Sequence, residues 1–300
     1  MSPRTTARAR EGAVAYLLAA RAADGRWEDY RLPVGVSDAW VTAYVALALA
    51  PEGDAGLRAA RGAAAWLLAN RRGSCAWGYN AVAGPDADST AHALLLLRAV
   101  GRRVPGADTA WLLARRRPCG GFATFAGPGA WGGAHPDVTP LAFRALPAGT
   151  RRRLAPRVLR YARRARHADG SWPAYWWRTR HYATYHNLLL LRALGCAETH
   201  LPVVRGDETR GVHTAMDLAL VLATAVVGMA PRALVDGLAR ELAALQRPDG
   251  GWAGGPNLRV TDPACERPWD EPVGRLYTDL RGLITTATAL AALRHAEGAA

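Results

Sequence analysis

The sequence has few cysteines, no lysine and no long apolar run. The four cysteines are Cys75, Cys119, Cys196 and Cys265. They lie far apart and form no CxxC pair, which argues against a disulfide framework or a thiolate zinc site and favours a reducing cytoplasm. The longest apolar stretch, 218–230, is shorter than the roughly 18–20 residues of a membrane span, so we expect no transmembrane segment. Residues 1–12 carry arginines but lack the apolar core of a signal peptide.

Lysine is absent although the chain is strongly basic. There are 38 basic and 25 acidic side chains, a formal net charge of +13. Such an excess suggests an anionic partner, but the exclusive use of arginine is typical of a GC-rich, bacterial coding sequence. No compact basic and aromatic motif of a nucleic-acid module is present. We therefore expect no nucleic-acid partner, and an anionic group on a small substrate explains the charge better.

The 300 residues supply enough apolar material for a large core. Half of them are hydrophobic and 21% are charged, which excludes a disordered chain. This length suits one large helical ring or two modest domains.

A repeat organises the chain. An apolar helix ends in a turn with glycine and an aromatic residue, and a polar stretch then leads into a second apolar helix. The turns are Asp24–Trp27, Gly73–Trp77, Gly120–Phe122, Asp169–Trp172 and Asp249–Trp252. The second helices open near Asp38, Asp88, Asp137, His186, Asp217 and Asp279. These positions are 50, 49, 49, 31 and 62 residues apart, which indicates six units with a short fifth and a long sixth.

Both helices of a unit show helical periodicity. Val14, Leu17 and Leu18 mark the first outer helix, whereas inner segments such as 93–99 and 188–194 are apolar nearly all round and therefore buried. Strand signals are almost absent. We predict an all-α fold, a single (α/α)6 barrel that spans residues 1–300 as one domain. Its fifth outer helix, in 197–210, is the weakest because it contains proline and glycine.

The two ends of this barrel differ. The loops from outer to inner helices are long and carry glycine, tryptophan and acidic residues, whereas the returning loops are short and plain. Function is therefore expected at the long-loop end, where the inner helices begin. The polar residues expected near this mouth are Asp38, Asp88, Asp137, His186, His213 and Asp279.

The most informative segment is Trp77-Gly-Tyr79-Asn, followed by Asp86-Ala-Asp88-Ser89-Thr-Ala. It resembles the Asp-x-Asp-Asp-Thr-Ala motif of the class II terpene cyclases, the squalene–hopene cyclase group, as a single-domain member. The segment Gln246–Trp252 is similar to the Gln…Gly-x-Trp repeat of that family. The resemblance implies that Asp88 protonates a terminal alkene or epoxide, that Asp86 supports it, and that Ser89 stands where a third aspartate is usual.

That chemistry fits these residue types. Neighbouring carboxylates cannot all ionise, so one of them keeps its proton, and a helix N-terminus stabilises the anion left after proton transfer. Aromatic faces stabilise a carbocation while they exclude water. The chain has 11 Trp, nine Tyr and three Phe.

Further side chains are candidates for substrate binding. The tryptophans of the Gly-x-Trp turns are expected to pack between helices, whereas other aromatic residues line a cavity. Candidates at or near the cavity are Trp40, Trp77, Tyr79, Trp131, Trp176, Trp177, Trp269 and Tyr277. His92, one turn after Asp88, suits a core role as well as a catalytic one. His186 and His213 could each orient an acid, and Asp86 and Ser89 could instead only cap a helix.

Two other classes share this type of barrel. A protein prenyltransferase-like chain would bind zinc, for which Asp262, Cys265 and His295 are the nearest match, although the spacing is one residue too long. A carbohydrate enzyme would pair Asp88 with Asp38 or Asp137 across a glycosidic bond. A barrel that holds a polyprenyl chain without protonating it also remains open.

The sequence therefore predicts proton-initiated cyclisation of a linear isoprenoid or related polyene in an aromatic-lined cavity. No metal or other cofactor is expected, and magnesium would enter only with a diphosphate substrate. The expected partner is a small hydrophobic substrate, and the chain could also form an oligomer.

Overall fold

The structure, a computed structural model, describes residues 4–71, 75–196, 214–270 and 274–298. It is mostly helical. The outer helices are α1 (Arg4–Ala19), α3 (Gly53–Ala69), α5 (Gly106–Leu113), α7 (Ala148–Ala165) and α10 (Arg232–Ala244). The inner helices are α2 (Ala39–Leu49), α4 (Ala87–Ala99), α6 (Thr139–Arg144), α8 (His181–Ala193), α9 (Ala215–Val227) and α11 (Leu283–Gly298). The outer helix expected in 197–210, and His213, lie outside the described residues.

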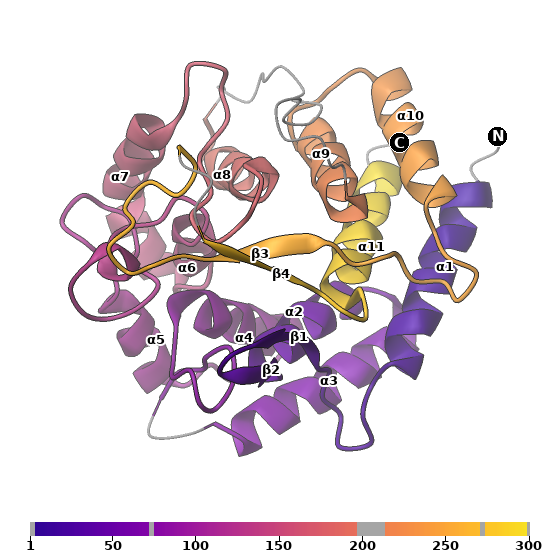
Figure 1. The fold of residues 1–300 in the computed structure, drawn as a ribbon, viewed down its shortest axis with the longest axis horizontal. Coiled ribbons are helices and arrows are strands. Elements are labelled where there is room, and N and C mark those ends of the chain that lie inside the picture. The colour runs from indigo at the N-terminus through magenta and orange to yellow at the C-terminus, as the bar shows by residue number, and fades with distance from the viewer. Residues whose placement is uncertain (1–3, 72–74, 197–213, 271–273, 299–300) are drawn as a thin grey trace.

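The inner helices contact one another in a closed order within the described part of the chain. Helix α2 packs on α4, α4 on α6, α6 on α8, α8 on α9, α9 on α11, and α11 again on α2. The outer helices lie against this ring (Figure 1), with α3 on α2, α5 on α4, α7 on α6 and α10 on α9. Helix α1 packs on α11, α10 and α3, which joins the two ends of the chain. No described helix is both long and apolar enough to cross a bilayer.

The tryptophans of the repeat turns connect their own outer helix to the following inner helix through hydrogen bonds. Each indole N–H donates to a carbonyl ten residues earlier, at 2.7–2.9 Å, in Trp27, Trp77, Trp172 and Trp252. The backbone N–H of each of these residues donates to a threonine hydroxyl in the first turns of the next inner helix. Phe122 bonds to Thr139 in the same way. The expected packing role of these turns is therefore confirmed.

The prediction of an all-α chain is wrong in one respect, because two long loops form hairpins. Strands β1 (Asp29–Leu32) and β2 (Gly35–Ser37) pair antiparallel between α1 and α2, and β3 (Pro256–Val260) and β4 (Arg275–Thr278) pair between α10 and α11. Gly35 has φ +101°, a left-handed conformation that permits the tight first turn. These strands are three to five residues long, too short to give a clear alternating pattern.

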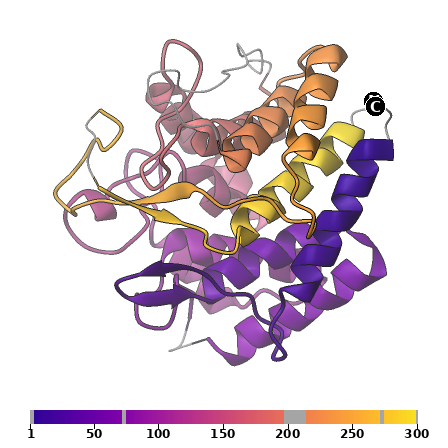
Figure 2. The ribbon, with the colours of Figure 1, turned by 45° about the vertical axis from the view of Figure 1, so that its right-hand side comes forward.

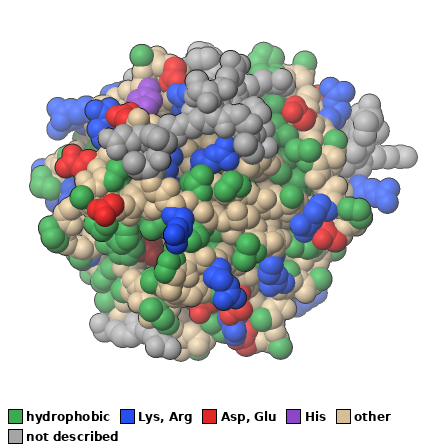
Figure 3. All heavy atoms as spheres, in the orientation of Figure 1, with side chains coloured by type: hydrophobic (Ala, Val, Ile, Leu, Met, Phe, Trp, Pro, Cys, Tyr) green, Lys and Arg blue, Asp and Glu red, His purple; other side chains and the backbone are tan. Residues whose placement is uncertain are grey.

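Both hairpins lie at the same end of the ring, where the inner helices begin (Figure 2). Strand β1 contacts β4, so the two sheets meet over this end. Strand β3 is also tied to the segment before α8, because Arg259 N–H donates to the Trp176 carbonyl and Arg178 N–H to that of Asn257. On the face in Figure 3, arginines are scattered among acidic and apolar side chains.

Candidate active site

A cavity of about 590 Å³ opens at the hairpin end of the ring. Its walls come from both hairpins, from the first turns of α2 and α4, and from the loops before α4, α6 and α8. The lining residues are Leu32, Pro33, Val34, Trp40, Tyr79, Ala83, Asp86, Asp88, Ser89, Thr124, Phe125, Ala126, Trp131, Val138, Trp176, Trp177, Leu258, Val260 and Tyr277. The long outer-to-inner loops thus enclose the site, as the sequence predicts. Its surface is almost wholly apolar apart from the start of α4 and Thr124.

Asp86 caps helix α4 and is held by two donors. Its Oδ1 accepts from the Ser89 N–H at 2.7 Å, and its Oδ2 accepts from the Ser89 hydroxyl at 2.6 Å. The residue is 5% exposed. The helix N-terminus and these two donors stabilise the ionised form of Asp86.

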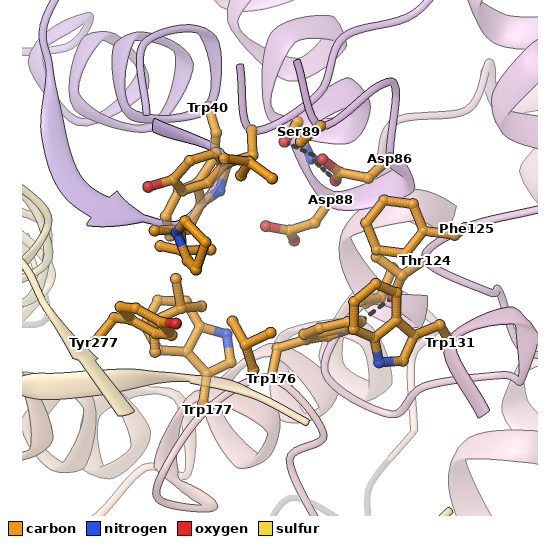
Figure 4. Close-up of a pocket in the computed structure, with 18 of the residues that line it drawn as sticks. Trp40, Asp86, Asp88, Ser89, Thr124, Phe125, Trp131, Trp176, Trp177 and Tyr277 are labelled. Carbon is orange, nitrogen blue, oxygen red and sulfur yellow. Dashed lines mark hydrogen bonds between the residues drawn. The ribbon is translucent and has the colours of Figure 1, made fainter. Parts of the chain in front are cut away.

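Asp88 lies in the first turn of the same helix but points into the cavity (Figure 4). Its Oδ1 is buried and has no hydrogen-bond partner among the described residues. Its Oδ2 lies 3.5 Å from Nδ1 of His92, one turn further along. The Trp40 indole N–H faces this carboxyl without meeting hydrogen-bond geometry.

Burial raises the pKa of both carboxyls to about 7. For Asp86, the Ser89 hydroxyl opposes this rise and the nearby charge of Asp88 adds to it. For Asp88, only the Trp40 indole opposes it. Ser89 gives two donors to Asp86 and none to Asp88, so hydrogen bonding favours the ionised form of Asp86 over that of Asp88.

The other acids predicted at this end of the ring accept hydrogen bonds from backbone N–H groups. Asp38 caps α2 through the Ala39 N–H. Asp137 accepts from the Tyr175 and Trp176 N–H groups at 2.8 Å each. Asp279 accepts from the Gly255 and Thr285 N–H groups at 3.0 and 2.8 Å. Burial raises the pKa of Asp137 to about 7 and that of Asp279 to about 6, yet neither residue lines the cavity.

Aromatic side chains flank Asp88 on two sides (Figure 4). On one side, the Trp40 ring lies 6.3 Å from that of Tyr79 and 6.1 Å from that of Trp177. On the other, Phe125, Trp131 and Trp176 contact one another with ring centroids 5.4–5.9 Å apart. The acid is thus bordered by π faces on both sides, an arrangement that can stabilise a cation in a dry site.

The sequence candidates divide into two sets. Those that line the cavity are Asp86, Asp88, Ser89, Trp40, Tyr79, Trp131, Trp176, Trp177 and Tyr277. Those that lie elsewhere among the described residues are Asp38, Trp77, His92, Asp137, His186, Trp269 and Asp279. Trp77 belongs to the bonded turns, and Asp38 borders a separate, polar cavity of about 170 Å³. Trp269 is half-buried and lies in the loop that follows β3 and precedes β4. The functional roles of all these residues remain predictions.

His92 and His186 lie deeper in the ring. His92 Nδ1 is 2.9 Å from the carbonyl oxygen of Asp88, so this nitrogen carries the proton and donates. Burial lowers the pKa of His92 to about 4 and that of His186 well below its usual value, so both imidazoles are neutral. His186 packs against the rings of Tyr182 and Tyr185 at 4.4 and 4.9 Å.

Sequence reasoning missed Thr124 and Phe125, which lie between the third repeat turn and α6. Thr124 accepts a hydrogen bond from the Trp176 indole at 2.7 Å. Phe125 follows the turn Gly120–Phe122 by three residues, and its position gives no periodic signal. The aliphatic lining from β3, Leu258 and Val260, was missed because that strand was not predicted.

The residues considered for zinc do not converge. Asp262 and Cys265 lie between β3 and β4, whereas His295 lies in the last turn of α11, roughly 18 Å along that helix from its start. No group of three or more potential ligands comes together anywhere in the described ranges.

Neither a protein-family model nor a curated protein sequence matches the chain. Among solved structures, a variant of the type II terpene cyclase MstE from Scytonema, in complex with geranylgeranyl dihydroxybenzoate (substrate), is 25% identical with a TM-score of 0.84. This match covers 99% of each chain. A protein from Actinoplanes is 29% identical, with a TM-score of 0.83, over 97% of this chain and 99% of the other.

An unsaturated glucuronyl hydrolase specific for heparin matches 99% of this chain and 98% of its own, at 11% identity and a TM-score of 0.56. That likeness shows a shared fold alone. Along its whole length, the chain is similar in structure to the type II terpene cyclase MstE.

Proposed function

We propose that this relative of the type II terpene cyclases catalyses proton-initiated cyclisation of a linear isoprenoid or related polyene, with Asp88 as the acid. The observation that carries the proposal is the environment of Asp88. Its carboxyl faces an aromatic cavity and accepts no hydrogen bond from a backbone N–H. The other acids at this end each accept at least one such bond; they are Asp38, Asp86, Asp137 and Asp279.

The first step transfers the proton of Asp88 to the terminal alkene carbon. The π electrons form the new C–H bond, and the neighbouring carbon becomes a cation. The Asp88 carboxylate is left at the N-terminus of α4, which stabilises it by about 0.3–1 kcal/mol or more. In this proposal Asp86 tunes the acid, because the two Ser89 donors favour the ionised form of Asp86 and a neighbouring negative charge favours the protonated form of Asp88.

The cation is then attacked by the next double bond, and each ring closure moves the charge along the chain. The aromatic faces around Asp88 stabilise these cations, at about 2 kcal/mol or more each when desolvated. The apolar walls keep water from quenching the cation. The final cation loses a proton, so the reaction is an isomerisation overall.

The substrate class follows from the cavity and from MstE. The MstE structures hold geranylgeranyl dihydroxybenzoate as substrate and merosterolic acid A as product. We propose a prenylated small molecule of this general kind for the present chain. The protonated Asp88 supplies the electrophile, so we propose no metal or other cofactor unless the substrate carries a diphosphate.

We also propose a barrel architecture, a cellular compartment and a class of partner for this chain. The ring of inner helices with outer helices around it supports a single (α/α)6 barrel over residues 1–300. The four cysteines lie among the described residues and none of them forms a disulfide, which suits the expected reducing cytoplasm. We propose a small hydrophobic substrate as the principal partner, with no nucleic acid.

The test is product formation by purified protein with geranylgeranyl dihydroxybenzoate and other linear isoprenoids. Asp88→Asn keeps the shape but removes the transferable proton, and general acid catalysis contributes about 10²–10⁴-fold, so we expect at least that loss. Asp86→Asn should cost less. Asp54→Asn, in the exposed first turn of α3, is the matched control and should keep full activity.

Binding of an unreactive analogue should change little in each variant, because the lost interaction belongs to the transition state. If folded Asp88→Asn remains active, Asp88 is not the acid. If wild-type protein binds these isoprenoids and cyclises none, the chain is a polyene-binding protein instead.

A further inference from the structure

Two buried polar atoms beside the cavity lack hydrogen-bond partners and complement each other. One is the indole N–H of Trp40 and the other is Oδ1 of Asp88, and neither forms a hydrogen bond with any described residue. Both side chains line the cavity, and Figure 4 shows the Trp40 indole beside the Asp88 carboxyl. An unpaired buried donor costs free energy, so a donor kept next to an acid calls for a functional reason.

The position of this indole is fixed by the rings around it. Trp40 is the second residue of α2 and is only 4% exposed. Its ring centroid lies 5.6–6.3 Å from those of four neighbours, which are Tyr30, Tyr44, Tyr79 and Trp177. These contacts restrict rotation of the side chain, so its N–H is held beside the carboxyl before the reaction begins.

One of these neighbours, Tyr30, has a strained backbone. Its φ is +55°, in the left-handed region that residues other than glycine rarely occupy, and it lies at a bulge of the first hairpin. The Asp29 carboxyl holds this bulge, because it accepts hydrogen bonds at 2.8–3.1 Å from the N–H groups of Tyr30, Arg281 and Leu283. The hairpin is thus anchored to the start of α11 in the geometry that packs Tyr30 against Trp40.

The reaction proposed above gives the indole N–H a strong acceptor. While Asp88 is protonated, its carboxyl is a weak acceptor. When the proton passes to the alkene, the O–H bond breaks and its electron pair stays on the carboxyl group as negative charge. A donor already in place then forms a charge-assisted hydrogen bond, which is about twice as strong as a neutral one. Because this bond is stronger after proton transfer than before, it lowers the barrier to protonation.

We propose that Trp40 donates its indole N–H to the carboxylate of Asp88 as that carboxylate forms. This role differs from that of Ser89, which donates to Asp86. The indole N–H bond stays intact, so only the proton of Asp88 is transferred. The inference rests on the proposed function, but the hydrogen bond can be measured without any substrate.

Other titratable groups near Asp88 determine which controls are needed. Five lie within its electrostatic range among the described residues, namely Asp86 and His92 on α4, Tyr44 on α2, Asp137 before α6 and Tyr182 on α8. Burial raises the pKa of both tyrosines above their ordinary value of 10.0 and lowers that of His92 to about 4, so these three do not titrate near pH 7. Burial raises the pKa of Asp86 and Asp137 to about 7, so variants of both are required.

The first experiment follows the indole N–H of the apoprotein by NMR. Labelling with ¹⁵N-tryptophan gives one indole peak for each of the 11 tryptophans, and the peak lost in Trp40→Phe belongs to Trp40. We expect the proton of this peak to shift downfield as Asp88 ionises, with a midpoint near pH 7. The shift should be absent from Asp88→Asn and should persist in Asp86→Asn and Asp137→Asn.

Trp66 is the matched control, because its indole N–H donates to the surface residue Asp24 at 3.2 Å. Burial acts in the opposite direction, but hydrogen bonds from Arg26 lower the pKa of Asp24 below its ordinary value of 3.8. The Trp66 peak should therefore stay constant between pH 5 and 9. Trp66→Phe should leave both kcat and its pH profile unchanged.

The second experiment measures turnover of geranylgeranyl dihydroxybenzoate. Trp40→Phe keeps an aromatic ring but removes the donor, so kcat should fall by about tenfold or more while KM changes by less than about twofold. Loss of a donor to the anion raises the pKa of Asp88, so the pH at which kcat falls should move up by about one unit. Trp177→Phe makes a neighbouring ring of the same wall smaller and should not move this midpoint.

Two results would overturn the inference. One is a wild-type spectrum in which no indole peak titrates, or in which the same peak also titrates in Asp88→Asn, and this result does not require Trp40→Phe to fold. The other is an unshifted pH profile in folded Trp40→Phe, because Trp40 would then act only through its ring. A Trp40 peak that titrates with Asp88 in a protein that cyclises no isoprenoid would support the hydrogen bond and overturn the proposed function instead.

Discussion

Asp86 is the N-cap of α4 and Asp88 lies two residues later in its first turn, yet Ser89 donates both its amide and its hydroxyl to Asp86 and neither to Asp88. Two carboxyls of the same helix end thereby acquire different roles. The one with donors caps the helix, and its hydrogen bonds favour its ionised form. The other faces the cavity, and in the proposed reaction it is the one that keeps the proton.

Ser89→Ala should weaken the acid site by removing the hydroxyl donor of Asp86. Asp86 then competes better for the shared proton, and a hydrogen bond to a charged group is worth about 1.5–3 kcal/mol. We expect kcat to fall by about tenfold or more with little change in KM. Ser171→Ala removes a comparable bond, from Ser171 to Asp169 at 2.7 Å in a repeat turn, and should leave kcat unchanged. Equal effects of the two substitutions would contradict the assigned role of Ser89.

The rate should depend on pH through the protonated form of Asp88. Because its pKa is raised to about 7, kcat should be constant near pH 5–6 and fall above about pH 7, by up to tenfold per pH unit. Melting temperatures over the same range control for unfolding. A kcat that rises between pH 6 and 9 would show that Asp88 acts as a base or not at all.

Asp88→Asn should change stability in a pH-dependent direction. The pKa of Asp88 in the folded state lies above its unfolded value of 3.8, so ionisation is less favourable in the folded protein. The free energy of unfolding of the wild type therefore falls as the pH rises towards 7. The asparagine does not titrate. The free energy of unfolding of the variant, relative to that of the wild type, should therefore rise by about 1–3 kcal/mol at pH 8 and by much less at pH 5. Denaturant unfolding at both pH values measures the difference, and a pH-independent difference would contradict the raised pKa.

Phe125→Leu should alter products more than stability. The substitution keeps apolar volume but removes one π face beside Trp131 and Trp176, worth about 0.5–2 kcal/mol to a passing cation. We expect more partly cyclised or water-quenched products by mass spectrometry. Phe143→Leu, buried in α6 away from the cavity, should destabilise the protein without a change in products. An unchanged product pattern in Phe125→Leu would exclude Phe125 from cation stabilisation.

Much of the fold was predictable because its signals are local or periodic. The indole bond of Trp172 reaches back ten residues to its own outer helix, so a single repeat unit specifies it. The apolar inner segments and the spacing near 49 residues gave the helical order. The two hairpins were missed, since β3 and β4 pair across a long loop and each strand is too short for a clear pattern.

For the site, the sequence by itself determined that Asp86, Asp88 and Ser89 share one helix start, because a helix places neighbours in sequence side by side. Only the tertiary structure decided which acids remain free for chemistry. The carboxyl of Asp137 accepts hydrogen bonds from backbone N–H groups 38 and 39 residues further along the chain. That of Asp279 accepts one from the N–H of Gly255, 24 residues earlier. Whether a carboxyl holds the backbone or faces a cavity depends on contacts between distant segments, and these form only when the ring closes.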